Sequence, residues 1–502
     1  MKLVVIENPR PLSMEHYNDV ANAPLSASLN SGYALAVARR AGWDVAFLDF
    51  TTCCDNEQAL AGAILAEGAD MVLLHWVYAW GHEAFVRDVL ELVKNRQDVP
   101  VGAFGLFPTL CRSRLMEYAP QLDFIIAGEF EKSLDELLCS FEKRQRLNTV
   151  VGLVLRDKEY LRRDVIEDLS WLPVPDDVGT NCRYTTMNIA ASRGCFGNCG
   201  FCFINRFYGC SRRRQRSIAS LEAEIEIRLQ RRVIDQLYFI DPTFIGYGTE
   251  QKKRIAAIGG IAKVAGIPFG FETRVDTVNE EIVSSLAHNG ASSIFLGIES
   301  GCDSVLQRIN KNVTTQQIVN AVHCIRKSGI PLTVGFIMFE PDSTVAELAE
   351  NYDFLEKLGL LSDHGLTANL LYHSQIMLYG SASWERFEKE GRLLLDEKLT
   401  FEAGYRFKND DVGRVCTTMR RLASAYFLGM DAARNRGVTT VDGPEVNRIL
   451  KEAFCVSLRH AGCSGRGDYN RMEQEFLDGL NSAVCSGSIR KHLKHGETEQ
   501  TE

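Results

Sequence analysis

Short apolar runs alternate with helical periodicity along the first 145 residues. The apolar runs are Leu3–Ile6, Val45–Phe50, Met71–Val77, Val99–Phe104 and Phe124–Ala127. Between them, apolar residues recur at helical spacing in Ser31–Ala41, Gln58–Glu67, His82–Lys94, Leu110–Tyr118 and Ser133–Phe141. Strands that are apolar throughout are typical of a parallel sheet covered by helices on both faces. The pattern therefore predicts a doubly wound α/β domain over residues 1–145, with any ligand at the carboxyl ends of its strands.

The residues between this domain and the next series of strands and helices differ from both in composition. Arg156–Arg163 is charged, and Leu172–Asp177 is rich in proline and aspartate. We predict a linker over residues 146–184.

Strand and helix patterns alternate again from residue 185. Six strands are predicted at Thr185–Ala191, Gln236–Ile240, Phe269–Arg274, Ser293–Glu299, Leu332–Phe339 and Thr367–His373. The helices after the first five are predicted at Ile218–Arg231, Thr249–Ala265, Glu280–Asn289, Gln316–Ser328 and Thr344–Leu358. Units of this kind close into a parallel barrel with its active site at the carboxyl ends of the strands. We therefore predict a partial (β/α)6 barrel over residues 185–399.

The last hundred residues carry weaker periodicity. Amphipathic helices are predicted at Val415–Met430, Val446–Leu458 and Tyr469–Val484, which gives a helical C-terminal domain over residues 400–502. Four cysteines of this region lack the spacing of metal ligands and are interpreted as structural: Cys416, Cys455, Cys463 and Cys485.

Composition and charge argue against nucleic-acid-binding, membrane-spanning and secreted proteins. The 502 residues carry a net charge of −9, which disfavours nucleic acid as a partner. No apolar run reaches about 18 residues, so no membrane span is expected, and the start reads as a strand and not as a signal peptide. We expect a cytoplasmic protein with reduced cysteines. The basic segment Ser211–Arg216 is either a solvated loop or a site for an anionic group.

Three cysteines directly after the first predicted barrel strand carry the strongest chemical signal. Cys195, Cys199 and Cys202 lie within eight residues, and glycines between them free the backbone. Three thiolates can hold a 4Fe–4S cluster and leave one iron open to another ligand. Two alternatives stand beside this reading: a zinc knuckle completed by Cys210, and unrelated thiols among the 15 cysteines.

The cysteine spacing resembles the signature of the radical SAM superfamily, Cys-x3-Cys-x-aromatic-Cys, with Phe201 at the aromatic position. The resemblance implies a 4Fe–4S cluster on Cys195, Cys199 and Cys202. It also implies S-adenosylmethionine (SAM) on the open iron and its cleavage to a 5′-deoxyadenosyl radical. An electron donor such as flavodoxin or ferredoxin and a small-molecule substrate belong to the same expectation.

The first domain resembles the Rossmann-like cobalamin-binding domain of one radical SAM subclass. The matching segments are Ala23–Ser26, Gly105–Thr109 and Ile126–Glu131. The resemblance implies cobalamin contacts from Gly105, Phe107, Pro108, Gly128 and Glu129. The Asp-x-His-x-x-Gly motif of cobalamin mutases is absent, since His16, His75 and His82 lie in other contexts. The alternative is a Rossmann-like domain that serves packing or dimerisation.

Residues at the later strand ends resemble the SAM-binding elements of the family. The resemblance implies SAM contacts from Asp241, Glu272, Arg274, Glu299, Ser300, Gly335 and Ile337. Asp241 could instead cap a helix, Glu272 and Arg274 could pair with each other, and Lys311, at a recurring family position, could be a surface lysine. Tyr372, His373 and Tyr379 are candidates for substrate contact.

The resemblance as a whole implies a cobalamin-dependent radical SAM methyltransferase. Such an enzyme methylates an unactivated carbon, or a phosphinate phosphorus, of a small natural-product intermediate through a 5′-deoxyadenosyl radical and methylcobalamin. Three alternatives remain: a non-methylating cyclase or ring-contracting oxidase, a methylthiotransferase, and a non-catalytic iron–sulfur or zinc protein. A methylthiotransferase carries a second three-cysteine set, which Cys53, Cys54, Cys111 and Cys139 do not resemble.

Overall fold

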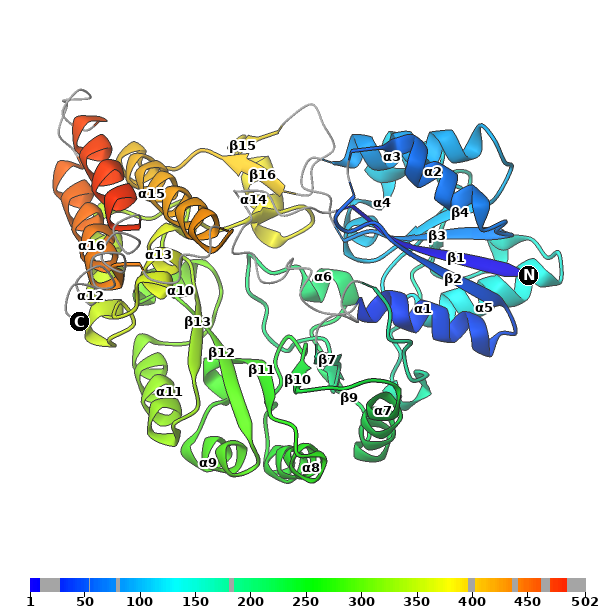
Figure 1. The fold of residues 1–502 in the computed structure, drawn as a ribbon, viewed down its shortest axis with the longest axis horizontal. Helices are drawn as coiled ribbons and strands as arrows, with labels where there is room; N and C mark the ends of the chain where they lie inside the picture. Colours follow the sequence, from blue (N-terminus) through cyan, green and yellow to red (C-terminus); the bar gives the residue numbers. More distant parts are fainter. Residues whose placement is uncertain are drawn as a thin grey trace, which may run out of the picture.

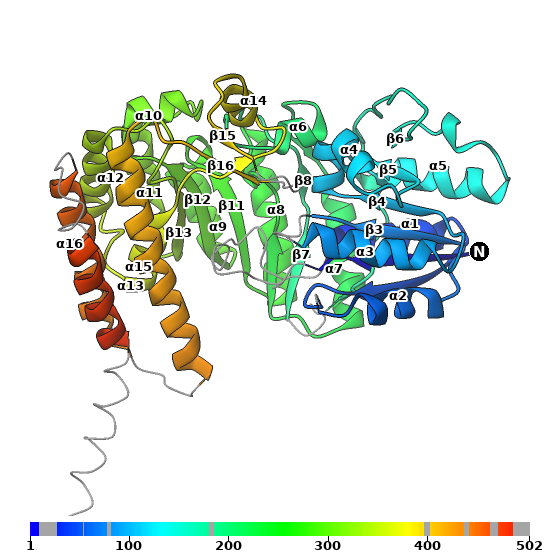
Figure 2. The same cartoon turned by 90° about the horizontal axis from the view of Figure 1, so that it is seen from above.

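The computed structural model describes residues 1–9, 28–53, 55–77, 82–179, 185–395, 402–435, 441–461 and 470–484. Three parts follow one another along the chain: a doubly wound domain, a parallel barrel-like domain and a helical region (Figure 1). The predicted fold class is thereby confirmed. Seen from above, the C-terminal helices lie on the opposite side of the barrel from the N-terminal domain (Figure 2). No helix of the described residues is long and apolar enough to cross a membrane.

The N-terminal sheet has the strand order β2-β1-β3-β4-β5-β6, in which β6 alone is antiparallel to its neighbour. Its strands are β1 (Lys2–Glu7), β2 (Asp44–Asp49), β3 (Met71–His75), β4 (Val101–Phe104), β5 (Phe124–Ile126) and β6 (Leu153–Val154). Its helices are α1 (Leu29–Arg40), α2 (Glu57–Ala66), α3 (Glu83–Lys94), α4 (Leu106–Tyr118) and α5 (Glu131–Glu142). Alternate residues of β1 enter two cores, one under α1 and α5 and the other under α2, α3 and α4. Both faces are therefore covered, as the apolar strands predict.

The segment predicted as a linker packs largely on the first domain. Its strand β6 pairs with β5, and Ile166, Leu169 and Leu172 are buried in the core under α1 and α5. The short 3-10 helices of this segment are η3 (Leu147–Thr149) and η4 (Leu169–Trp171). The domain boundary itself stays a prediction, and residues 180–184 lie outside the described part of the chain.

The second domain is built on a parallel sheet of order β13-β12-β11-β10-β7. The strands are β7 (Thr186–Ile189), β10 (Gln236–Phe239), β11 (Phe269–Arg274), β12 (Ala291–Glu299) and β13 (Leu332–Phe336). The helices outside the sheet are α7 (Ile218–Arg231), α8 (Glu250–Ala265), α9 (Glu280–His288) and α11 (Thr315–Ser328) (Figure 1). Shorter elements are η6 (Val275–Thr277) and α10 (Asp303–Arg308). Five of the six predicted barrel strands are confirmed.

The sixth predicted strand, Thr367–His373, is wrong. These residues belong to helix α13 (His364–Tyr372), which is followed by an isolated parallel bridge between Phe339 and Ser374. Asp363 caps the helix by accepting a hydrogen bond from the Leu366 N–H at 2.9 Å. The apolar residues that suggested a strand are buried at helical spacing, so the short run was ambiguous between the two periods.

The C-terminal region is mainly helical, with α12 (Val345–Lys357), α15 (Asp410–Asn435), α16 (Gly443–His460) and a further helical segment at 470–484. Before α15 lies a small antiparallel sheet of β14 (Met377–Leu378), β16 (Glu402–Tyr405) and β15 (Leu393–Leu394), with α14 (Ala382–Lys389) beside it. The expectation that residues from 400 onward are all helical is therefore wrong at β16, where Tyr405 packs into a small aromatic core with Trp384 and Phe387.

Candidate active site

The cysteine loop leaves the barrel after β7 and is closed at its base by a two-stranded hairpin. The hairpin strands are β8 (Ser192–Arg193) and β9 (Arg214–Gln215). Gly194 begins the loop in the left-handed region at φ +81°, and a Cβ there would lie 2.2 Å from the Arg212 carbonyl oxygen. Glycine is therefore required at the first position of the loop.

Contacts with three other parts of the chain fix the loop, two through the backbone and one through a side chain. The Gly200 N–H donates to the Ile309 carbonyl at 2.8 Å, and the Ser383 N–H donates to the Gly200 carbonyl at 2.9 Å. Phe201 packs against a small cluster of buried residues that includes Ile337, just beyond β13. The aromatic position of the motif thus anchors the loop on the barrel.

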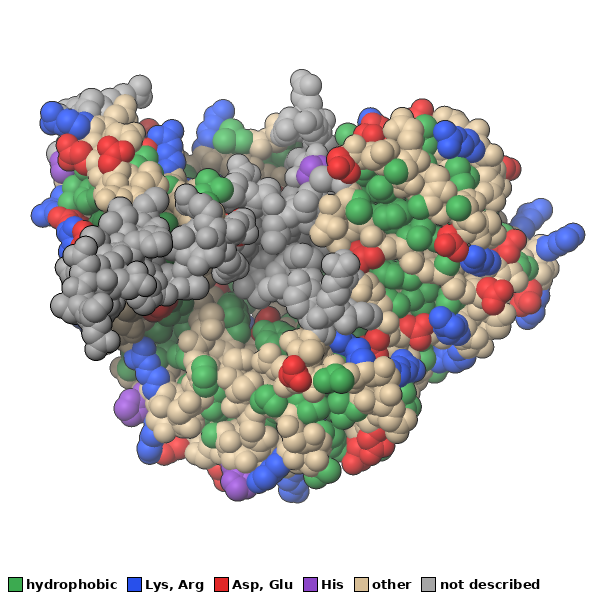
Figure 3. All heavy atoms as spheres, viewed as in Figure 1, with side chains coloured by type: hydrophobic (Ala, Val, Ile, Leu, Met, Phe, Trp, Pro, Cys, Tyr) green, Lys and Arg blue, Asp and Glu red, His purple; other side chains and the backbone are tan. Residues whose placement is uncertain are grey.

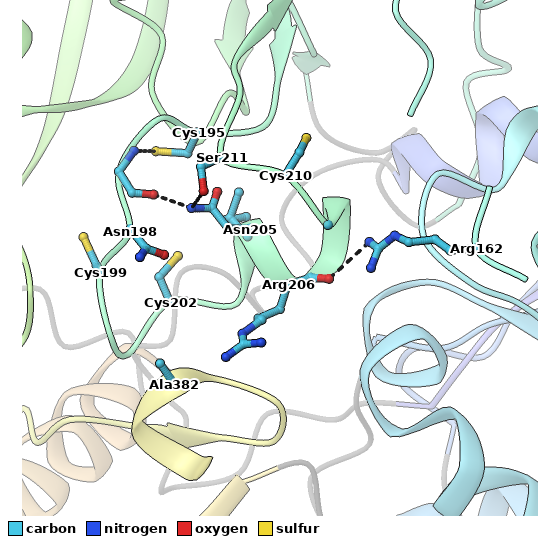
Figure 4. Close-up of a pocket in the computed structure, with 13 residues that line it drawn as sticks. Arg162, Cys195, Asn198, Cys199, Cys202, Asn205, Arg206, Cys210, Ser211 and Ala382 are labelled. Atoms are coloured by element: carbon cyan, nitrogen blue, oxygen red, sulfur yellow. Dashed lines mark hydrogen bonds between the residues drawn. The ribbon is translucent and has the colours of Figure 1, made fainter. Parts of the chain in front are cut away.

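Cys195, Cys199 and Cys202 line one pocket of about 480 Å³, together with residues of the short helix α6 (Ile204–Tyr208) (Figure 4). Cys210 borders the same pocket, but its sulfur points away from the other three (Figure 4). In the part of the chain that the structure describes, no three His, Cys, Asp or Glu side chains converge on a single ion. In a 4Fe–4S cluster each thiolate binds a different iron, so a pocket lined by three separate thiols fits that group.

Burial favours the protonated form of two of the thiols, Cys195 and Cys202. It raises the pKa of Cys195, and it raises the pKa of Cys202 to about 12. The Gly197 N–H donates to the Cys195 sulfur at 3.3 Å and opposes this effect. Because iron binds thiolates, uptake of a cluster here has to release protons.

Arg274 lies against the loop from the end of β11. Its guanidinium donates to the Cys199 sulfur at 3.3 Å and to the Lys311 carbonyl at 2.9 Å. A Cβ at Gly197 would lie 2.4 Å from the same guanidinium. Its ion-pair partner is Asp276, at 2.9 Å, so the predicted alternative of a pair with Glu272 is wrong.

Asp241 and Glu272 stand at the neighbouring strand ends. Fully buried Asp241 accepts hydrogen bonds from the Ala191 N–H at 2.9 Å and from the Ser192 hydroxyl, so it binds the entry to the cysteine loop. Glu272 accepts a hydrogen bond from the Tyr238 hydroxyl at 3.1 Å, and burial raises its pKa. Their contacts with SAM stay predictions.

Glu299 has the strongest local evidence for a ligand role. It adopts φ +64°, a conformation that non-glycine residues rarely hold and that is concentrated at functional sites. Its carboxylate pairs with Lys311 at 2.7 Å, and both side chains are largely buried. The predicted alternative of Lys311 as a surface lysine is therefore wrong. Gly297 leaves room beside the pair, since a Cβ there would lie 2.6 Å from Glu299 Oε1.

Three other predicted SAM contacts surround this pair. A Cβ at Gly335 would lie 3.8 Å from Glu299 Oε2, and the Ile337 N–H donates to the Glu299 carbonyl at 2.7 Å. Ser300 is buried and donates to Asn351 Oδ1 at 2.8 Å. Gly335 and Ile337 therefore lie beside Glu299, whereas the Ser300 hydroxyl is engaged with α12.

The three candidates for substrate contact fall into two places. Tyr372 and His373 have ring centroids 4.5 Å apart, and His373 Nε2 lies 2.7 Å from Asn369 Oδ1. Burial, assisted by the charge of Arg420, lowers the pKa of His373 to about 4. Tyr379 lies elsewhere, beneath the Arg114 guanidinium of α4 at 5.1 Å. Only Tyr372 and His373 are brought together.

The carboxyl edge of the N-terminal sheet holds the predicted cobalamin residues. Gly105 adopts φ +113° before α4, and a Cβ there would lie 2.9 Å from the Trp76 carbonyl oxygen. The Thr109 hydroxyl donates to the Gly105 carbonyl at 2.6 Å and accepts from the Gly128 N–H at 2.9 Å. Phe107 packs edge-on against Trp76, and Pro108 is buried in the first turn of α4. This tight glycine turn, with close backbone approach, fits a domain that binds a large cofactor at its strand ends.

Sequence reasoning missed a buried polar pair at the same edge. His75 Nδ1 lies 2.8 Å from Glu7 Oε1, and the Ser31 hydroxyl donates to Glu7 Oε2 at 2.6 Å. Glu7 and His75 are the last residues of β1 and β3. The signal in the sequence was a glutamate directly after the apolar run Leu3–Ile6 and a histidine within the apolar run Met71–Val77.

The basic segment 211–216 is neither a solvated loop nor an open anion site. Arg214 pairs with Glu129 at 2.7 Å, Arg216 pairs with Glu224, and Arg213 donates to the Thr243 carbonyl at 2.8 Å. Arg212 alone of the four arginines is exposed, beside Glu167. On the face shown in Figure 3, basic and acidic side chains are interspersed. Glu129, predicted as a cofactor contact, therefore binds the hairpin of the cysteine loop, and its role toward cobalamin stays a prediction.

A doubly wound domain followed by a partial parallel barrel, with a three-cysteine loop after the first barrel strand, defines a class of iron–sulfur enzymes with a second cofactor domain. Residues 189–355 match the radical SAM superfamily, and residues 27–138 match the B12 binding domain. The chain therefore carries a radical SAM domain and, before it, a B12-binding domain. Its cofactors are accordingly a 4Fe–4S cluster, SAM and cobalamin.

Two curated relatives show how far this similarity extends. An uncharacterized methyltransferase of Pyrococcus horikoshii is 28% identical over 285 residues, which are 54% of this chain and 61% of that protein. The 4'-phospho-dehydrooxetanocin synthase of Priestia megaterium is 27% identical over 318 residues, 56% of this chain and 42% of that protein. The chain thus aligns with less than two thirds of each relative.

A solved structure shares the whole fold. The cobalamin-dependent SAM radical enzyme OxsB, with aqua-cobalamin bound, superposes with a TM-score of 0.77 at 18% sequence identity. The superposition covers 100% of this chain and 82% of OxsB. The arrangement of the domains is therefore shared, while the identity is too low to transfer residue roles.

Proposed function

We propose that this chain is a cobalamin-dependent radical SAM methyltransferase that acts on a small natural-product intermediate. The reacting atom would be an unactivated carbon or a phosphinate phosphorus. The observation that carries the proposal is the direct attachment of the cysteine loop to the carboxyl edge of the B12-binding domain through Glu129, Arg193 and Arg214. This attachment supports the proposal that the sites for both cofactors belong to one connected unit.

We assign the cluster, SAM and the substrate to different residues of the chain. Cys195, Cys199 and Cys202 would hold the cluster, and Glu299 with Lys311 would orient SAM beside it. When bound, the cluster supplies the electron that cleaves SAM to a 5′-deoxyadenosyl radical, and cobalamin supplies the methyl group. The polar pair of Tyr372 and His373 offers a neutral imidazole for substrate contact.

A second candidate is a non-methylating radical SAM enzyme, because the relative from Priestia megaterium is named a synthase. The methylating function is preferred because the relative of slightly higher identity is named a methyltransferase. A methylthiotransferase finds less support: Cys111 on α4 and Cys139 on α5 lie on opposite faces of the N-terminal sheet.

The test is anaerobic reconstitution with iron, sulfide and cobalamin, followed by incubation with SAM, a reductant and candidate substrates. Methyl transfer should yield both S-adenosylhomocysteine and 5′-deoxyadenosine, whereas a non-methylating enzyme should yield 5′-deoxyadenosine alone. Cys199→Ala should lose the cluster, and the matched control Cys210→Ser should retain it. Failure to retain cobalamin would overturn the proposal, and one zinc per chain in place of iron would favour the zinc knuckle.

The electron donor and the location belong to the same proposal. Cleavage of SAM needs one electron, which flavodoxin or ferredoxin could supply, and an exposed iron–sulfur cluster needs a reducing compartment such as the cytoplasm. Reduction of the reconstituted cluster by purified flavodoxin, followed by its visible spectrum, would test the donor.

A further inference from the structure

Four buried charged side chains join the B12-binding domain to the base of the cysteine loop. Glu129 and Glu131 come from the N-terminal domain, and Arg193 and Arg214 come from the hairpin below the loop. Arg193 donates to Glu129 at 3.2 Å and to Glu131 at 2.6 Å. Arg214 donates to both oxygens of Glu129, at 2.7 and 3.0 Å. All four side chains are at most 8% exposed.

The two arginines are direct cross-strand partners in the hairpin of β8 and β9. The segment between them carries the three cysteines and α6. Like charges directly opposite each other destabilise a strand pair. Glu129 supplies a carboxylate to both arginines, so a single side chain of the other domain holds the two ends of the cysteine loop together.

Contacts around this cluster fix its geometry. The Arg193 guanidinium lies over the Tyr33 ring of α1 at 5.3 Å, and the Arg214 guanidinium lies over the Tyr208 ring of α6 at 5.2 Å. The Ile166 N–H also donates to Glu129, at 2.7 Å. One arginine therefore packs on the N-terminal domain and the other packs on the cysteine loop itself.

The barrel binds the same strand from its other side. Ala191 and Ser192 donate to Asp241 at the end of β10, and the next residue, Arg193, turns to the glutamates. Cys195 follows two residues later. The position of the first cysteine is thus determined by consecutive contacts with both domains.

We infer that Glu129 and Glu131 are positioning residues for the iron–sulfur cluster, through which the B12-binding domain sets the geometry of the cysteine loop by way of Arg193 and Arg214. The inference rests on cluster binding, which is part of the proposed function, and it is independent of methyl transfer and of the substrate. Arginine cannot lose its proton, so removal of the Glu129 charge leaves Arg214 buried without its carboxylate and Arg193 with Glu131 alone, and the hairpin has to open toward water.

The test compares Glu129→Gln, Glu131→Gln and Glu129→Asp in the full chain after anaerobic reconstitution. The matched control is Glu167→Gln, which alters the exposed ion pair with Arg212 on the same loop. The measurements are the rate of iron loss to a chelator and the electron paramagnetic resonance spectrum and midpoint potential of the reduced cluster, with thermal unfolding alongside. Glu129→Gln should lose iron about tenfold faster or more and change the spectrum and potential. Glu131→Gln should have a smaller effect, Glu129→Asp should restore part of the spectrum, and Glu167→Gln should match the wild type.

A lower melting temperature of Glu129→Gln with an unchanged spectrum, potential and chelation rate would show a purely structural role and overturn the inference. If Glu129→Gln does not fold, Glu131→Gln decides by the same readouts, because it leaves Glu129 bound to both arginines. A wild-type chain that takes up no iron would overturn the proposed function and this inference together. A loaded wild type with unaltered variants would overturn the inference alone.

Discussion

Glu129 accepts hydrogen bonds from both Arg193 and Arg214, which face each other across the hairpin at the base of the cysteine loop. Glu129 follows β5 at the edge where a doubly wound domain binds ligands. The same edge is also where this domain meets the barrel. A polar residue at a strand end can therefore serve the domain contact, and its sequence position alone does not distinguish that role from ligand binding.

The stability of the chain should depend on the charge of Glu129. Burial alone would raise its pKa, but Arg193 and Arg214 outweigh burial and hold the pKa below its ordinary value of 4.5. The stabilisation is therefore fully present above about pH 4.5 and is lost as the pH falls through the lower pKa of the folded state. Glu129→Gln should lower the free energy of unfolding by roughly 3–5 kcal/mol at pH 7.

The measurement is denaturant unfolding of wild type and Glu129→Gln between pH 7 and pH 3. The difference between the two should shrink below about pH 4.5, because the Glu129 carboxyl of the unfolded wild type takes up a proton there, and it should be lost as the pH falls through the lower pKa of the folded state. Glu167→Gln, which removes an exposed partner, should change the free energy by less than about 1 kcal/mol at any pH. A difference that is constant across the range would contradict this account.

Gly297→Ala should weaken SAM binding without loss of the cluster. The added Cβ would lie 2.6 Å from Glu299 Oε1 and 3.0 Å from Lys311 Nζ, so it has to displace the ion pair. We expect the dissociation constant for SAM to rise about tenfold or more, equal to about 1.4 kcal/mol. Isothermal titration with reconstituted protein would measure it. The control is Gly260→Ala on α8, where a Cβ meets nothing within 4 Å. Equal affinities of Gly297→Ala and Gly260→Ala for SAM would show that the Glu299–Lys311 ion pair is not part of the SAM site.

Gly105→Ala should impair cobalamin retention. The residue adopts φ +113°, and a Cβ would approach the Trp76 carbonyl and the His75 ring within 2.9 Å. The turn before α4 has to shift, at a cost of about 1–3 kcal/mol in stability. Absorbance of cobalamin that stays bound through gel filtration would report the loss. Gly62→Ala, in α2 with open space around it, should retain cobalamin as the wild type does.

His373 should stay neutral throughout the physiological pH range. Its pKa of about 4 lies below that of a histidine in an unfolded chain, about 6.5. As the pH falls from about 6.5 toward 4, the unfolded state takes up the proton first, so this residue should lower stability over that window. Nuclear magnetic resonance of the labelled imidazole would show a neutral ring at pH 6. A titration midpoint near 6.5 would contradict the buried environment.

The sequence predicted the parts of the molecule that repeat a pattern. Five barrel strands and the cysteine loop after β7 could be found because parallel strands are apolar throughout and the three cysteines have a distinctive spacing. Thr367–His373 failed because a short apolar run fits a strand and a buried helix equally well. The feature that distinguishes the helix from a strand is the cap Asp363, one residue that lies four positions before Thr367.

The site was predicted less completely because its contacts join distant parts of the chain. Arg214 and Glu129 are 85 residues apart, so the basic segment around Arg214 looked solvated or ready for an anion. The partner of Arg274 is Asp276, two residues away, and not Glu272, the other charged residue predicted at this strand end. Pairing between charges is decided by the packing of the domains, which periodicity does not reveal.

The contacts of Gly200 bear on the order of events during biosynthesis. Its N–H is bound by Ile309 and its carbonyl is bound by Ser383, more than a hundred residues later in the chain. A nascent chain that ends before Ser383 lacks one of the two contacts, so the loop completes its shape only after that residue has left the ribosome. We therefore expect cluster insertion to be a late event, and a chain truncated before Ser383 should take up less iron than the full-length protein.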